Sequence, residues 1–340
     1  MKILLCSPVP PPNGGIASWT VEYINFVTSQ GISVDLVDCS IKGNRISQPN
    51  KFSIFDEINR FKKIVINFKS CIKNNLYSVI HINSSGSILG IIRDLILVKI
   101  SKSNNIVIQY HCDVKHQIKG IFKKLILKST IKYVDKFFCL NRDSYDFLNE
   151  LGAKNVYQVN NFYSKNILSH SYRENISNIL FVGRICKDKG IDTIYRLARD
   201  FPKLKFNLVG KVEMNKYIKL KPANVILHGD RDWDYITMSF IDSDVFLFPS
   251  LHEGFPMAIL EAMAFSLPIL ASNVGAISEL LSPDAGIVID NNEYSLFSNK
   301  LSELYDLNER KKLGTNANAK ILKYVPSIVL RNLIELYSGE

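Results

Sequence analysis

The sequence predicts an α/β protein built on two parallel sheets, and three observations lead to this prediction. The chain has 340 residues, of which 46% are apolar, enough for two hydrophobic cores of ordinary size. Short β-branched or apolar runs alternate with longer amphipathic runs, as they do in βαβ units. These strand-like runs are too numerous for one ordinary doubly wound sheet. The high apolar content also excludes a disordered chain, and six cysteines are too few for a disulfide scaffold.

The expected elements fall into two series separated by a polar stretch. Strand-like runs of the first series lie at residues 2–6, 33–37, 78–82, 106–110, 136–140 and 156–159. Those of the second series lie at residues 178–182, 205–209, 225–228, 245–248, 268–271 and 286–289. Helical patterns lie at residues 16–30, 55–73, 118–134, 191–201, 257–265, 294–307 and 327–337. The Ser- and Asn-rich stretch at 163–177 between the two series is typical of a linker.

The positive charge of the chain is confined to its first half. The formal net charge is +10 for the whole chain. Residues 1–162 hold 21 Lys plus Arg against 11 Asp plus Glu, whereas residues 163–340 hold 21 of each. Such a balance favours nucleic acid, an anionic membrane surface or a phosphorylated substrate as partner. The cysteines form no C-x-x-C pair, which favours a reducing, cytoplasmic compartment.

The segment 248–264 carries the strongest signal for a site. A strand leads through a polar loop to Pro256, which suits the first turn of a helix. Amides of Met257 and its neighbours would then face a crevice and offer a site for a phosphate. Glu253 precedes this helix and Glu261 lies on it, a spacing that suits two sets of sugar hydroxyls. Spacing alone favours a plainer interpretation, in which Glu253 stabilises the helix N-terminus and Glu261 is a surface residue.

The same segment closely resembles the E-x7-E signature of the family-4 glycosyltransferases. The shared pattern is Pro-Ser-x-x-Glu-Gly-Phe-Pro-x-x-x-x-Glu-Ala-Met-Ala. The resemblance implies a retaining enzyme of the GT-B fold, in which two Rossmann-like domains with parallel sheets face each other across a cleft. It implies that Glu253 contacts the donor sugar and acts in catalysis, and that Glu261 binds the ribose diol. The neighbouring residues implied to bind the donor are Gly254, Phe255, Pro256 and Met257.

The resemblance also implies a domain plan. Residues 1–163 would form the N-terminal acceptor domain, to which a C-terminal helix at 325–340 returns. Residues 164–324 would form the domain that binds the nucleotide sugar. The change in charge balance falls close to this boundary, so the acceptor domain is the basic one.

Two cations follow the first strand of the second series. Arg184 and Lys189 flank the turn in the run Val-Gly-Arg-Ile-Cys-Lys-Asp-Lys-Gly that ends at Gly190. Cations that face a cleft suit a diphosphate that is first held and then stabilised as a leaving group, although most loop cations are simply solvated. The run resembles the family's Val-Gly-Arg and Lys-Gly signature. The resemblance implies that Arg184 and Lys189 bind the diphosphate, whereas Lys187 falls outside the pattern.

The first half contributes two further candidates. Gly14 and Gly15 follow the first strand-like run and allow a close backbone approach at a helix start, although two glycines there commonly form a plain turn. His111 follows a later strand, where a lone His is usually structural. The resemblance implies that the Gly-Gly loop contacts donor phosphate or acceptor, and that His111 and Asp113 lie close to the donor sugar.

No metal is expected at this site. Asp-x-Asp patterns at 230–232, 232–234 and 242–244 suggest a divalent cation, but Arg184 and Lys189 already supply the countercharge of a diphosphate. We therefore expect a metal-independent enzyme whose co-substrate is a nucleotide diphosphate sugar, with UDP favoured.

The basic residues gather at 51–73 and 115–136, where Lys124, Lys128 and Lys132 share one helix row. A solvated helix face and an anionic membrane patch explain this pattern equally well, and no nucleic-acid-binding module is recognisable. We expect transfer of a hexosyl or N-acetylhexosaminyl group to a glycan or lipid-diphosphate-linked acceptor in bacterial surface polysaccharide synthesis. The enzyme would be cytoplasmic or peripheral at the inner face of the plasma membrane. A nucleotide-sugar epimerase and an inactive sugar-nucleotide binding protein remain as alternatives.

Overall fold

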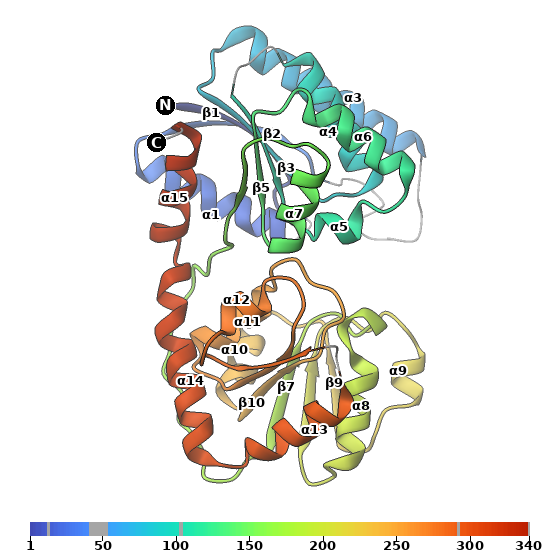
Figure 1. Ribbon diagram of the computed structural model, residues 1–340, viewed down its shortest axis with the longest axis vertical. Helices are drawn as coiled ribbons and strands as arrows, with labels where there is room; N and C mark the ends of the chain where they lie inside the picture. The colour runs from blue at the N-terminus through green and yellow to red at the C-terminus, as the bar shows by residue number, and fades with distance from the viewer. Residues whose placement is uncertain (12–13, 41–53, 102–104, 291–292, 339–340) are drawn as a thin grey trace. The chain divides into compact units, whose positions relative to one another are not determined.

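The computed structural model describes residues 1–11, 14–40, 54–101, 105–290 and 293–338. The chain forms two compact units. Unit 1 comprises Met1–Asn160 and Pro326–Glu340, and unit 2 comprises Asn161–Val325. Figure 1 shows that each unit has one sheet with helices packed on its faces. The α/β prediction with two separate parallel sheets is confirmed.

Unit 1 is built on a six-stranded sheet in the order β2-β1-β3-β4-β5-β6, in which all neighbouring strands are parallel. Its strands are β1 (Lys2–Ser7), β2 (Ser33–Asp38), β3 (Val79–Ser84), β4 (Ile106–Tyr110), β5 (Lys136–Cys139) and β6 (Val156–Gln158). The central strands β3 and β4 are buried along their whole length, as expected of parallel strands that helices cover on both faces.

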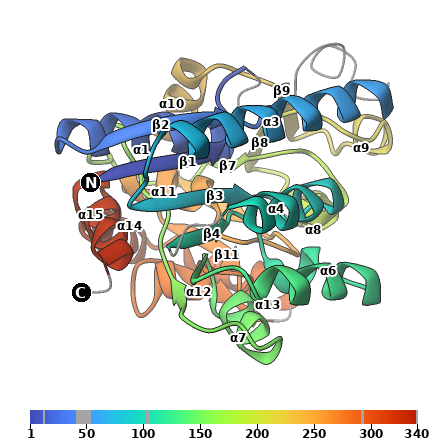
Figure 2. The ribbon, with the colours of Figure 1, turned by 90° about the horizontal axis from the view of Figure 1, so that it is seen from above.

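The helices of unit 1 are α1 (Gly15–Ser29), α3 (Ile54–Asn74), α4 (Ile88–Ile100), α5 (Val114–Gln117), α6 (Ile121–Ile131), α7 (Arg142–Glu150) and α15 (Pro326–Ser338). Helices α3, α4 and α6 lie in a row on one face of the sheet (Figure 2). The helix expected at 118–134 is present as α6, which ends at Ile131 and begins only after Gly120. This residue has a φ of 88°, a conformation that glycine adopts without strain.

Unit 2 has a second six-stranded parallel sheet, in the order β12-β11-β10-β7-β8-β9. Its strands are β7 (Asn178–Val182), β8 (Lys205–Val209), β9 (Val225–Gly229), β10 (Val245–Phe248), β11 (Ile269–Ser272) and β12 (Ile287–Ile289). Asp244 fixes the start of this sheet, since its carboxylate accepts the amides of Ser177 and Asn178, each over 2.8 Å. One carboxylate of the Asp-x-Asp patterns thus has a structural role.

The helices of unit 2 are α8 (Ile191–Asp200), α9 (Lys216–Lys219), α10 (Trp233–Ile241), α11 (Met257–Ala264), α12 (Ile277–Leu281), α13 (Tyr294–Glu303) and α14 (Leu307–Ile321). The helix expected at 294–307 extends too far, because α13 ends at Glu303. The Asp306 carboxylate then caps α14 by accepting the amide of Asn308 over 2.8 Å. Within the described ranges of both units, no helix has the length and apolar character needed to cross a membrane.

Buried hydrogen bonds fasten α15 to the rest of unit 1. The Tyr337 hydroxyl lies 2.8 Å from the hydroxyl of Tyr23 on α1 and 2.6 Å from Nδ1 of His81 on β3. All three side chains are buried, and burial lowers the pKa of His81 to about 3. The imidazole is therefore neutral at neutral pH. The helix expected at 325–340 is present, although residues 339–340 lie outside the described residues.

We predict that Tyr337→Phe lowers the free energy of unfolding of unit 1 by about 2 kcal/mol, because it removes one hydroxyl from two buried polar partners. Urea unfolding followed by Trp19 emission, in a Trp233→Phe background, measures this change in unit 1 alone. Tyr133→Phe, at an exposed tyrosine of the same unit, serves as the control. Equal stability of the two variants would contradict the prediction.

Candidate functional site

The loops after β7 and β10 lie at one edge of the unit 2 sheet. The two strands are parallel neighbours, so their carboxyl ends are adjacent, which is where open α/β sheets bind ligands. The first loop passes through the 3₁₀ turn Lys187–Lys189 into α8, and the second passes into α11. The candidate donor residues of the second half therefore come from two neighbouring loops and the helix that follows one of them.

Backbone contacts hold the two loops together. The amide of Leu251 donates to the carbonyl of Asp188 over 2.8 Å, and the Ser250 hydroxyl donates to the same carbonyl over 3.3 Å. Gly190 has a φ of 69°, and a Cβ at this position would overlap the carbonyl oxygen of Pro249. The final glycine of the Lys-Gly signature is thus required by the close approach of the second loop.

A buried ion pair joins two of the predicted donor ligands. The Lys189 ammonium pairs with Oε1 of Glu253, and the Ser250 hydroxyl donates to the same oxygen over 2.6 Å. Only 16% of the Lys189 side chain and 10% of the Glu253 side chain are exposed. Water therefore screens this pair weakly, and each charge depends strongly on the other. The structure brings together two residues that lie 64 positions apart in the sequence.

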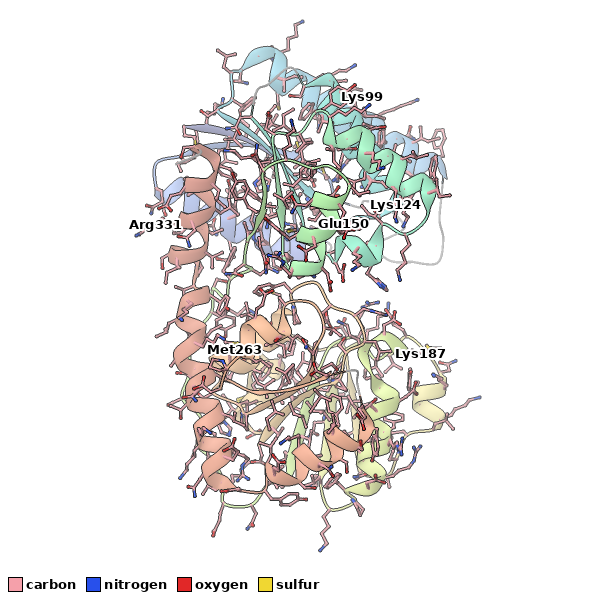
Figure 3. All side chains as sticks on the ribbon, in the orientation of Figure 1. Lys99, Lys124, Glu150, Lys187, Met263 and Arg331 are labelled. Atoms are coloured by element: carbon pink, nitrogen blue, oxygen red, sulfur yellow. The ribbon has the colours of Figure 1, made fainter. Side chains whose placement is uncertain are left out.

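Arg184 makes a different ion pair. Its guanidinium donates to the Glu213 carboxylate over 3.1 Å, and 60% of its side chain is exposed. The Glu213 amide donates to the carbonyl of Ile185 over 3.2 Å, which fixes Glu213 beside the first loop. Sequence analysis missed Glu213, since no motif marks an acidic residue after β8. Lys187, which the signature excludes, is exposed at the outer edge of the unit (Figure 3).

The second loop is closed by a segment from further along the chain. The carbonyl of Gly254 accepts the amide of Ala276 over 3.1 Å. Gly275 has a φ of 60°, and a Cβ there would overlap the carbonyl oxygen of Glu253. Gly190 therefore allows the backbone to pass close to Pro249, and Gly275 allows it to pass close to Glu253.

Helix α11 begins directly beyond this loop. Phe255 and Pro256 are buried, and Met257 is partly exposed at the first helical position. Pro256 is the N-cap residue and supplies no side-chain hydrogen bond to the helix. The amide of Ile259 donates to the Pro256 carbonyl over 3.1 Å. The first two amides of the helix therefore need partners from outside it, and the positive end of the helix dipole favours an anion there. Figure 3 shows Met263, on the buried side of the same helix, inside the unit.

Glu261 lies about one turn into α11 and is partly buried. Burial raises the pKa of its carboxyl to about 7, and the charge of Lys165 opposes this shift. The Lys165 ammonium lies above the ring of Trp233, 2.9 Å from its centroid. Glu261 is therefore not the solvated surface carboxylate that spacing alone favoured. At neutral pH it exchanges readily between a hydrogen-bond donor and an acceptor form.

His111 lies in unit 1, at the carboxyl end of β4. Its Nε2 is 2.9 Å from Oδ1 of Asn83 at the end of β3, and burial lowers the pKa of His111 to about 3. The imidazole is therefore neutral, with its Nε2 proton directed at Asn83. Asp113 has a structural role, since its carboxylate caps α5 by accepting the amide of His116 over 2.9 Å.

A cavity of about 670 Å³ opens in unit 1 beside the first loop. Its lining includes Gly14, Gly15, Asn83, Arg60 and Arg93. A Cβ on either glycine would meet no described atom within 4 Å, so the start of α1 faces open space rather than packed chain. Sequence analysis did not assign the two arginines to a site. The signal was weak, because one lies in an amphipathic helix and the other interrupts an apolar run.

Residues 167–320, which contain the two loops and α11 of unit 2, match the family described as glycosyl transferases group 1. This match lies within unit 2 and covers less than half of the chain. The resemblance that the sequence motifs indicated is thereby confirmed for the half of the chain that carries them.

Two relatives have names that mention a cps region or capsular polysaccharide biosynthesis. An uncharacterized 41.2 kDa protein in the cps region of Klebsiella pneumoniae is 29% identical over 170 residues, which are 48% of this chain and 46% of that protein. The capsular polysaccharide biosynthesis glycosyltransferase CapM of Staphylococcus aureus is 25% identical over 207 residues, which are 55% of this chain and 53% of that protein. The chain spans about half the length of these relatives.

One solved structure shares the fold over the whole length of the chain. Anabaena Alr3699/HepE, solved in complex with UDP-glucose, matches with a TM-score of 0.78 at 15% identity, and the match covers 100% of both chains. At this identity the likeness is one of fold. The GT-B fold class predicted from the motifs is confirmed.

We predict that Gly190→Ala lowers the stability of unit 2 more than Gly229→Ala does. Both glycines have positive φ, 69° and 73°, but a Cβ at Gly229 would meet no described atom within 4 Å. Gly229→Ala should therefore cost only about 1 kcal/mol of conformational strain, while Gly190→Ala must also displace the loop at Pro249. Urea unfolding followed by Trp233 emission, in a Trp19→Phe background, compares the stabilities of the two variants. Equal losses of unfolding free energy would contradict the close contact at Pro249.

We predict that Glu261→Gln becomes more favourable relative to the wild type as pH rises. The folded chain holds the Glu261 pKa at about 7, above its ordinary value of 4.5. The carboxyl therefore supports the fold fully below about pH 4.5, and this support is lost as pH rises through 7. The difference in unfolding free energy should grow by about 2 kcal/mol between pH 5 and pH 8. A difference independent of pH would contradict this.

Proposed function

We propose that this protein is a retaining glycosyltransferase that moves a sugar from a nucleotide diphosphate sugar to a glycan or lipid-linked acceptor. We favour a UDP-sugar carrying a hexosyl or N-acetylhexosaminyl group, and a role in surface polysaccharide synthesis in the cytoplasm or at the inner face of the plasma membrane. The observation that carries the proposal is the buried Lys189–Glu253 pair, held between two loops whose backbones are bonded to each other.

The diphosphate of the donor would bind to the positive groups of unit 2. In the structure Lys189 and Arg184 are each paired with a carboxylate, Glu253 and Glu213 respectively. A diphosphate can replace these carboxylates as the partner of both cations, and the first-turn amides of α11 add further donors. Once Lys189 turns to phosphate, the Glu253 carboxylate is free to accept hydrogen bonds from the sugar. Diphosphate binding and sugar binding are coupled in this way.

The same cations would stabilise the transition state. Negative charge accumulates on the diphosphate as its bond to the sugar breaks, and fixed positive groups lower the energy of that charge most strongly where water is scarce. We propose that the acceptor hydroxyl attacks on the face from which the diphosphate leaves. Its proton passes to the departing phosphate oxygen, so the anomeric configuration is retained and no separate base is required.

Three further residues have proposed roles in binding. His111 is neutral at neutral pH, so it would act as a hydrogen-bonding partner of the donor sugar rather than as a cation. Glu261, with a pKa of about 7, would bind the ribose diol. The acceptor would enter the unit 1 cavity beside Gly14, where polar and basic side chains surround open space.

Support from known proteins is consistent with this assignment. CapM is named as a capsular polysaccharide biosynthesis glycosyltransferase, and the first relative lies in a cps region. The Alr3699/HepE structure, which shares the fold, holds UDP-glucose. These names motivate the choice of donor and pathway.

A panel of nucleotide sugars, each incubated with and without glycan acceptors, tests the proposal. Release of free nucleotide that depends on acceptor supports transfer. Conversion of the donor into a second nucleotide sugar supports an epimerase. Tight donor binding without any turnover supports an inactive binding protein. Analysis of the product's anomeric configuration decides between retention and inversion.

We predict that Glu253→Gln, Lys189→Ala and Arg184→Ala each lower kcat/KM by about a hundredfold or more, since each removes a group that would stabilise the sugar or the leaving diphosphate. Arg142→Ala is the matched control, because this exposed arginine also pairs with an acid, Asp146. It should alter kcat/KM by less than about twofold. Full activity in the three site variants would rule out the site.

A further inference from the structure

Helix α6 exposes a ridge of large apolar side chains to solvent. Ile121 is 80% exposed, Phe122 is 66% exposed and Leu125 is 57% exposed. We call these three residues the α6 ridge. They lie within two turns on the outer side of the helix, while Leu127 and Thr130 face the sheet and are buried. A helix of a soluble unit ordinarily places polar residues on this outer side. Contiguous exposed apolar surface usually marks an interaction site.

Lysines border the ridge. Lys124 and Lys128 are exposed on α6, and Lys132 is exposed directly after it. Figure 3 shows Lys124 on the outer side of the helix. Residues 114–134 contain six lysines and no acidic residue. Two acids of α7 have basic partners, since Asp143 pairs with Lys115 and Asp146 pairs with Arg142. The surface around the ridge is therefore both apolar and strongly positive.

The neighbouring helices extend the positive surface on the same face of unit 1. Helix α3 lies in the row with α4 and α6 (Figure 2), and its exposed lysines include Lys62, Lys63 and Lys69. Residues 51–53 of the basic segment lie outside the described residues. The excess positive charge of the first half is thus presented partly on one broad face, next to the α6 ridge.

This combination selects an anionic bilayer as the partner. A second copy of the chain would bring like charges together, which opposes self-association through this face. A nucleic acid would place its phosphates against three apolar side chains, which can make no favourable contact with them. At a membrane, by contrast, the ridge can enter the acyl boundary while lysine ammonium groups reach the headgroups along their flexible stems.

We propose that α6 is a membrane-docking element, which inserts Ile121, Phe122 and Leu125 into an anionic leaflet and holds headgroup phosphates with Lys124 and Lys128. This docking mode rests on the proposed function, because a lipid-linked acceptor gives unit 1 a reason to lie against a bilayer. It goes beyond that function in naming the inserted element. Docking of α6 does not depend on long-range electrostatic attraction alone, because apolar insertion and positive charge act on the same helix.

Flotation with vesicles of phosphatidylethanolamine and phosphatidylglycerol tests the ridge. The full chain should bind these vesicles, and should bind phosphatidylcholine vesicles more weakly by about tenfold or more. The variant Ile121→Asn, Phe122→Asn, Leu125→Asn keeps the net charge and should lose at least about tenfold in partitioning. Lys124→Gln, Lys128→Gln should lose a similar amount at low salt and little at high salt.

The matched control is Ile218→Asn, Leu220→Asn in unit 2. These residues are 56% and 62% exposed and also lie among lysines, but they belong to the unit with no excess charge. This control should bind vesicles like the wild type. A Phe122→Trp variant should show a blue-shifted emission on anionic vesicles, whereas Ile218→Trp should not.

Wild-type binding by the α6 ridge variant would overturn the proposal, as would failure of the wild type to bind anionic vesicles or equal loss in the unit 2 control. Donor turnover, measured without vesicles and with a water-soluble acceptor, should be unchanged in the ridge variant, which also shows that it folds. A chain that binds vesicles but turns over no donor keeps the docking element and loses the proposed function. A chain that turns over donor but does not bind vesicles keeps the proposed function and loses the docking element.

Discussion

The contact between the β7 and β10 loops is the constraint on which the candidate site depends. Two parallel neighbours end side by side, and their loops approach so closely that a Cβ at Gly190 would overlap the backbone of Pro249. This approach buries the Lys189–Glu253 pair. A pair so placed is costly to separate unless a ligand replaces one partner. The structure therefore holds two opposite charges largely away from water, at the place where we propose that the donor binds.

Charge is distributed differently in the two units, and the difference matches their proposed tasks. Unit 2 balances its cations locally, as Arg184 with Glu213 and Lys189 with Glu253 show. Such balanced cations can exchange partners with a diphosphate at little electrostatic cost. On α6 of unit 1, lysines surround exposed apolar residues without acids between them. The positive potential of that surface extends over a Debye length, so the surface suits an extended anionic partner rather than a small ligand.

Each unit holds a buried titratable group among its candidate residues, His111 in unit 1 and Glu261 in unit 2. The pKa of His111 falls to about 3 and that of Glu261 rises to about 7, and in both cases burial disfavours the charged form. An imidazole that stays neutral can direct a hydrogen bond without carrying a positive charge. A carboxyl that titrates near neutrality can donate or accept a hydrogen bond, and it therefore suits a diol, whose hydroxyls do both. None of this is visible in the sequence, because burial depends on which elements cover each side chain.

The sequence by itself determined the strand pattern, the fold class and the motif residues, because apolar periodicity and the Glu253 and Arg184 signatures are local. It misplaced helix ends where the apolar pattern continues past them, as at Gly120 before α6 and at Glu303, where α13 ends. Only the tertiary structure decided that Lys189 meets Glu253, that Glu213 holds Arg184, and that the α6 ridge faces solvent. Pairing and exposure depend on residues distant in sequence, whereas a helix pattern shows that one side is apolar without showing whether that side is covered.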